Sequence, residues 1–68
     1  MNQYSILLPS NFGMIQIGHM AHENTGHFVV NFKINNSNGI MRMVFSDKTS
    51  ASYYIRNFFP NSLLVKEE

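Results

Sequence analysis

Most of the expected fold depends on one short segment, Asn35-Asn36-Ser37-Asn38-Gly39. Asn-Gly is a strong signal for a two-residue hairpin turn, because both central residues of a type I′ turn have positive φ and these residue types tolerate it best. The segment lies between two runs in which apolar and polar residues alternate, residues 28–34 and 40–45. Such alternation is typical of strands with one buried face, so we expect a β-hairpin that turns at Asn38-Gly39.

This turn and an earlier one predict the register of three strands. With Asn38-Gly39 as a two-residue turn, the expected pairs are Ser37 with Ile40, Ile34 with Met43, and Phe32 with Phe45. The earlier turn, residues 23–26, ends on a glycine where a left-handed residue is commonly needed. If that turn closes between His22 and His27, the expected pairs are Ala21 with Phe28, His19 with Val30, Ile17 with Phe32, and Ile15 with Ile34.

Both registers place the same side chains on one face of the sheet. This predicted core face consists of Ile15, Ile17, Ala21, Phe28, Val30, Phe32, Ile34, Met41, Met43 and Phe45. A slip of one residue at either turn would divide these side chains between the two faces, because side chains alternate along a strand. The opposite face is expected to be mixed and wet, with Met14, Gln16, Gly18, Met20, His22, His27, Val29, Asn31, Lys33, Arg42 and Val44.

The hydrophobic period changes after residue 45. One apolar stripe at helical spacing, formed by Ala51, Tyr54, Ile55 and Phe58, predicts a helix within residues 46–59. Ser46 or Asp47 can cap its start by accepting a bond from a free backbone N–H. Pro60 ends it, because the residue before a proline avoids the helical conformation.

The two ends of the chain are expected to form strands, at residues 3–8 and 62–66, and we place the last strand beside the first. The predicted fold is therefore one α+β domain over residues 1–68, with element order β-β-β-β-α-β. It has two layers, an antiparallel sheet of four to five strands and one helix packed on one face of that sheet.

Composition limits what this domain can use for stability and for binding. A chain of 68 residues buries only about 60% of its unfolded surface, and without cysteine it has no disulfide to support the core. The charged fraction is 13%, against about 25% in typical soluble domains. Two explanations remain open: an AT-rich gene that favours Asn, Ile and Phe codons, or a surface partly covered by another chain, since interface centres are depleted in charge.

The sequence favours a cytoplasmic location. The first lysine or arginine is Lys33, and the apolar run at residues 6–8 stops at Pro9, so we expect neither a signal peptide nor a membrane span. The absence of cysteine agrees with a reducing compartment. The net charge of +1 is too small to imply a nucleic-acid or membrane partner by itself.

We expect no catalysis and no cofactor. The serines are not part of a nucleophile elbow, and no phosphate loop or dinucleotide fingerprint is present in the sequence. In the register above, His22 and His27 lie opposite each other beside Glu23, and such a group can in principle hold zinc or nickel. Histidines at the mouth of a hairpin are usually only solvated, and His19 falls on the other face, so we expect no metal site.

A nucleic-acid-binding module that uses the open sheet face is the alternative function. Its candidate residues are Lys33, Arg42, Lys48 and Arg56. Four scattered cations are few, because each phosphate contact adds only modest affinity. A third possibility is a homodimer that joins exposed strand edges.

The favoured function is that of a small non-enzymatic module that binds a larger protein or protein complex stoichiometrically. Its candidate contact residues are Met14, Met20, Val29, Tyr53, Arg56 and Phe59. These residues combine apolar side chains expected off the core face with the aromatic and arginine types that dominate interfaces. Very small, cysteine-free, Asn-rich cytoplasmic proteins include inhibitors of host machinery encoded by phages and mobile elements, and size and composition suggest that class.

Overall fold

A computed structural model describes residues 2–33 and 40–67 of the chain. The elements are β1 (Asn2–Ser10), β2 (Gly13–His22), β3 (Phe28–Lys33), β4 (Ile40–Phe45), α1 (Lys48–Phe58) and β5 (Leu63–Lys66). The predicted turn at Asn38-Gly39, its Ser37 pair and the core position of Ile34 lie outside the described residues.

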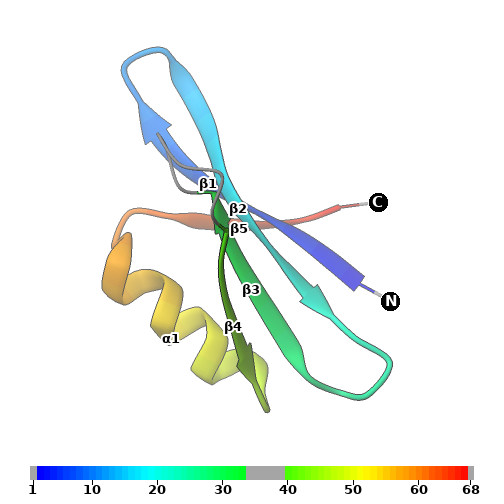
Figure 1. The fold of residues 1–68 in the computed structure, drawn as a ribbon. Coiled ribbons are helices and arrows are strands. Elements are labelled where there is room, and N and C mark those ends of the chain that lie inside the picture. Colours follow the sequence, from blue (N-terminus) through cyan, green and yellow to red (C-terminus); the bar gives the residue numbers. More distant parts are fainter. Residues whose placement is uncertain (1, 34–39, 68) are drawn as a thin grey trace.

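The five strands form one antiparallel sheet in the order β4-β3-β2-β1-β5. Helix α1 packs on one face of this sheet (Figure 1). The α+β class, the element order and the placement of the last strand beside the first are therefore confirmed. The sheet face away from α1 is called the open face below.

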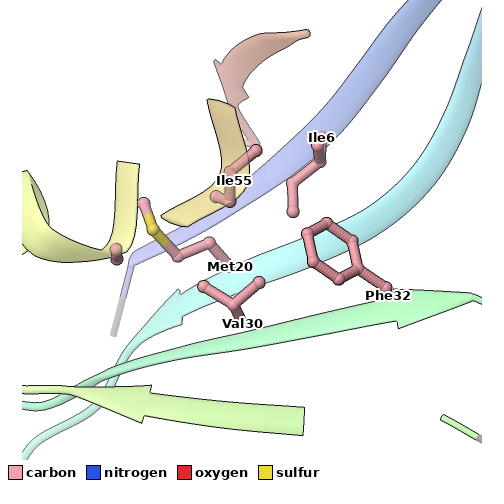
Figure 2. Close-up of a cluster of buried hydrophobic side chains, with 6 residues drawn as sticks. Ile6, Met20, Val30, Phe32 and Ile55 are labelled. Carbon is pink, nitrogen blue, oxygen red and sulfur yellow. The ribbon is translucent and has the colours of Figure 1, made fainter. Parts of the chain in front are cut away.

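The core lies between α1 and the sheet (Figure 2). It consists of Ile6, Met20, Val30, Phe32, Ala51 and Ile55, which come from β1, β2, β3 and α1. Phe32 is the one aromatic residue among these six, and the centroids of the Tyr54 and Phe59 rings lie 6.0 and 5.3 Å from the centroid of its ring. Aliphatic and aromatic packing thus joins the helix to three strands.

The register between β2 and β3 differs by one residue from the prediction. Ala21 pairs with Val29, and Phe28 pairs with His22. The turn is shorter than expected: Gly26 N–H donates to the Glu23 carbonyl at 2.9 Å, and Glu23 N–H donates to the His27 carbonyl at 2.9 Å. Gly26 has φ 94°, which confirms the left-handed glycine and fits a three-residue hairpin loop closed by a bulge.

That single-residue shift reverses the faces of the second half of β2. Met20, Gly18 and His22 lie on the helix side of the sheet, and Ala21 and His19 lie on the open face. Placing Met20 on the outer face and Ala21 in the core was wrong for this reason. The His22 ring stacks on the Phe28 ring with centroids 4.1 Å apart, so the expected His22–His27 pair is wrong as well.

A β-bulge at Ile17 separates the two halves of β2. Ile6 pairs with Gly18, but the next residue of β1, Leu7, pairs with Gln16, so Ile17 has no partner on β1. A bulge changes which face the following side chains take. Ile15 therefore shares the helix side with Met20, although the two are separated by an odd number of residues.

The register between β3 and β4 differs by four residues from the prediction. Phe45 pairs with Phe28, and Phe32 pairs with Met41. An even shift preserves the face of every side chain, so Phe32 and Phe45 lie on the helix side as expected but are not direct neighbours. The Tyr54 ring connects them instead, with centroids 6.0 Å from Phe32 and 5.0 Å from Phe45.

Helix α1 begins and ends at the predicted signals. Asp47 is the N-cap, and its carboxylate accepts a bond from the Ser50 backbone N–H at 2.7 Å. This bond lowers the pKa of Asp47, because it stabilises the ionised carboxylate. The helix stops at Phe58, and Phe59 before Pro60 has a non-helical conformation. No helix in residues 2–33 and 40–67 is long and apolar enough to cross a membrane.

The hairpin of β1 and β2 extends past the helix (Figure 1). Its turn, Asn11-Phe12, is held by the Ser10 hydroxyl, which donates to the Gly13 carbonyl at 2.7 Å and accepts from the Phe12 N–H at 3.2 Å. Phe12 at the tip is 100% exposed. The tip of the hairpin is therefore not stabilised by packing against the core.

Candidate functional site

Helix α1 has two flanks of different chemistry. Ala51 and Ile55, four residues apart, face the sheet and are buried. The four-residue rows on either side are Lys48, Ser52 and Arg56 on one flank and Ser50, Tyr54 and Phe58 on the other. The first row faces β1 and β5, since it lines one hollow together with residues of those strands. The second row faces β4, since the Tyr54 ring packs on Phe45.

An apolar hollow of about 390 Å³ lies on the β4 flank. We call it the aromatic hollow; its lining residues are Phe45, Thr49, Ser50, Tyr53, Tyr54 and Asn57. Tyr53 is 70% exposed, whereas Tyr54 is held between the rings of Phe45 and Phe58, each 5.0 Å away. The wall of the hollow is thus an aromatic stack anchored in the core, with the exposed Tyr53 at its rim.

The hollow lies beside an edge of the sheet. β4 is the outermost strand in the described part of the chain and pairs only with β3 there. Its side chains Met43 and Val44 are half-exposed on opposite faces. An apolar edge strand of this kind has unpaired backbone N–H and C=O groups that another strand can join.

A second hollow, of about 320 Å³, lies on the opposite flank of the helix. We call it the basic hollow; its lining residues are Tyr4, Lys48, Ser52, Ile55, Arg56, Ser62, Leu63 and Leu64. The Lys48 ammonium stands 4.8 Å from the centre of the Tyr4 ring, a cation–π contact that holds it over the hollow. None of the described lining residues is acidic.

A chain of polar contacts crosses the open face. Glu67 Oε2 accepts from the Ser5 hydroxyl at 3.1 Å and lies 3.1 Å from His19 Nδ1. Gln16 continues the chain, because its amide donates to Ser5 at 3.0 Å and accepts from Lys33 Nζ at 3.3 Å. These bonds join residues of β1, β2 and β3 to Glu67, directly after β5, so the network holds the strands together.

The predicted protein-binding residues do not form one surface. Met20 is 0% exposed and Val29 is 3% exposed, so neither can contact a partner while the sheet is intact. Phe59 packs against the core through Phe32. The other three candidates are exposed but separated: Met14 lies on the open face near the hairpin turn, Tyr53 lines the aromatic hollow, and Arg56 lines the basic hollow.

The predicted nucleic-acid-binding residues are divided between the two faces of the sheet. Lys33 and Arg42 lie on the open face, where Arg42 pairs with Asn31. Lys48 and Arg56 lie on helix α1, which covers the other face. A phosphate backbone that runs over one face can therefore reach only two of these cations.

The histidines lie apart. His22 stacks on Phe28, His19 contacts Glu67, and His27 Nδ1 lies 3.0 Å from the Thr25 hydroxyl. Within residues 2–33 and 40–67, no three His, Cys, Asp or Glu side chains are grouped so that they can hold a metal ion.

Several residues of the two hollows were missed from the sequence. The row of Lys48, Ser52 and Arg56 was visible as a four-residue repeat on a predicted helix, which is a usable signal. Tyr4 and Ser62 come from segments far apart in the chain, and only the pairing of β1 with β5 places them near that row.

Comparisons of the chain with protein-family models, with curated proteins and with solved structures find no match.

Proposed function

We propose that this chain is a non-enzymatic, cytoplasmic module that binds an extended segment of a larger protein, in the manner of a small stoichiometric inhibitor. The observation that supports this most is the aromatic hollow beside β4, which pairs only with β3 in the described part of the chain. The partner segment adds a strand to β4 and places an apolar side chain in the hollow.

The chemistry of this flank suits such a segment. Peptides that add a strand to a sheet gain affinity from main-chain hydrogen bonds and specificity from pockets for alternate side chains. The polar side chains of Thr49, Ser50 and Asn57 line the hollow together with the three aromatic rings. An aromatic centre with a polar rim is the usual anatomy of a protein interface.

The two other hypotheses make different demands. Nucleic-acid binding requires a continuous cationic track, and the division of Lys33 and Arg42 from Lys48 and Arg56 argues against one. A homodimer that pairs β4 with β4 of a second copy uses the same edge. Such a homodimer would have a melting temperature that rises with protein concentration.

The proposal predicts that Tyr53→Ala weakens partner binding about tenfold or more without changing the fold. Tyr53 lines the hollow but is 70% exposed, so its removal costs the core little. Tyrosines at interface centres often contribute about 2 kcal/mol, and 1.4 kcal/mol corresponds to a factor of ten. The measurement is the affinity of immobilised chain for the partner that it retains from lysate of its native cell, at low and at high salt.

Phe12→Ala is the matched control, because it removes an exposed aromatic ring far from the hollow. The proposal is supported if the immobilised chain still retains a protein partner at high salt. The amount of retained partner should then fall with Tyr53→Ala and stay unchanged with Phe12→Ala. If only Phe12→Ala abolishes partner binding, the interface lies at the hairpin tip and the proposal is wrong. Salt-sensitive retention of nucleic acid in place of a protein would replace the proposal by its alternative.

A further inference from the structure

We propose that the basic hollow is a binding site for the phosphoryl group of a small organic phosphate. This site is separate from the aromatic hollow, and its existence does not depend on the proposed protein-binding function. Two cations, three hydroxyl groups and an apolar floor converge on one concave surface. That combination suits a ligand with an anionic head and a carbon body.

Helical geometry directs both cations to the same hollow. Lys48 and Arg56 are eight residues apart on α1, so their backbones are about 12 Å apart along the helix axis, at opposite ends of the hollow. Both side chains are long enough to reach inward. The Tyr4 ring already positions the Lys48 ammonium above the hollow.

Among the residues that the structure describes, no carboxylate pairs with Lys48 or Arg56. The one contact there between a basic side chain and a carboxylate joins His19 and Glu67 on the open face. A third cation, Lys66, pairs with Tyr4 across β1 and β5 and therefore projects from the same face as the hollow. A group of cations around a concave surface raises the local concentration of anions.

The uncharged lining residues indicate the chemical class of the ligand. The hydroxyl groups of Tyr4, Ser52 and Ser62 can each donate to a phosphoryl oxygen, and the planar Arg56 side chain can donate two parallel bonds. Leu63 and Leu64, with the buried Ile55 behind them, provide apolar surface that a bare phosphate ion cannot use. The volume, about 320 Å³, is at the low end for ligand pockets and suits a small molecule.

The test measures the affinity of the chain for phenyl phosphate, inorganic phosphate and phenol by titration calorimetry. Phenyl phosphate is expected to bind saturably and more tightly than either of the other two, because it alone provides both the anionic head and the apolar body. Lys48→Gln and Arg56→Gln are each expected to weaken phenyl phosphate binding about tenfold, the scale of one hydrogen bond to a charged group.

Lys33→Gln and Arg42→Gln are the matched controls, because each removes one positive charge from the open face and leaves the hollow intact. Both are expected to bind phenyl phosphate as the wild type does, and circular dichroism shows whether each variant is folded. If all four variants weaken phenyl phosphate binding equally, the ligand is attracted only by the net charge of the chain, and the proposed site is wrong. No saturable binding of phenyl phosphate, or tighter binding of a short oligonucleotide with a steep salt dependence, would overturn it too.

Discussion

Replacing Phe32 by alanine is expected to leave a large fraction of the molecules unfolded at room temperature. Phe32 is 3% exposed, and the rings of Tyr54, Phe58 and Phe59 surround it at 6.0, 6.1 and 5.3 Å. Truncating a buried Phe to Ala costs about 3–5 kcal/mol. At about 0.05–0.15 kcal/mol per residue, the whole chain has a free energy of unfolding of the same order.

Phe45→Ala is the comparison, because Phe45 lies on the same face but is only half-buried and contacts the cluster through Tyr54. Urea unfolding followed by circular dichroism measures both variants. We expect the loss in unfolding free energy to be clearly larger for Phe32→Ala. An equal or larger loss for Phe45→Ala would mean that the core is centred nearer the end of β4 than the structure places it.

Replacing Gly18 by alanine is expected to destabilise the chain by about 3 kcal/mol or more, the upper range for inserting an atom into a packed interior. A Cβ atom at Gly18 would overlap the Asn31 carbonyl oxygen and lie 3.1 Å from the Phe32 Cα. These are backbone atoms of the neighbouring strand, so no side-chain rotation relieves the clash. Gly18 pairs with Ile6 on one side and with Phe32 on the other, so an alanine there forces β2 and β3 apart beside two core residues.

Gly13→Ala is the control for this prediction. Gly13 has φ 111° but nothing within 4 Å of a Cβ, so alanine there brings backbone strain of about 1–2 kcal/mol and no clash. Denaturant unfolding of the two variants separates the effects. A Gly18→Ala variant that is as stable as Gly13→Ala would show that β2 and β3 do not approach each other as closely as the structure indicates.

The sequence was sufficient for the fold class but not for every register. The Asn38-Gly39 signal predicted a hairpin between β3 and β4, and those strands do pair. Their register differs by four residues, and hydrophobic alternation cannot detect this difference, because an even shift leaves every side chain on its face. Five successive residues that favour turns, at 35–39, also allow more than one turn position.

The error in β2 had a different cause. Both faces of this strand carry apolar side chains, so its sequence fits either orientation. The bulge at Ile17 then allows Ile15 and Met20 to lie on the same side of the sheet, which strict alternation forbids. Gly18, next to the bulge, was the available signal, since glycine inside a strand often marks a bulge or a close backbone approach.

These registers also explain which candidate contact residues are exposed. Met20 was expected on the surface because the predicted register was wrong by one residue, and it lies in the core. Tyr53, Arg56 and Phe59 were assigned from the helical period alone, which does not depend on strand register. Tyr53 and Arg56 are exposed, but Phe59 follows the last residue of the helix and packs against Phe32.

Hydrogen exchange of the chain, alone and in complex with its partner, tests most directly whether the β4 flank binds an extended protein segment. Backbone amides at the edge of the sheet exchange quickly until another strand pairs with them. The account predicts that the partner slows exchange in Ile40–Phe45 and around Tyr53, and leaves the other edge strand, Leu63–Lys66, unchanged. Protection confined to the hairpin tip at residues 11–15, with β4 unaffected, would contradict it.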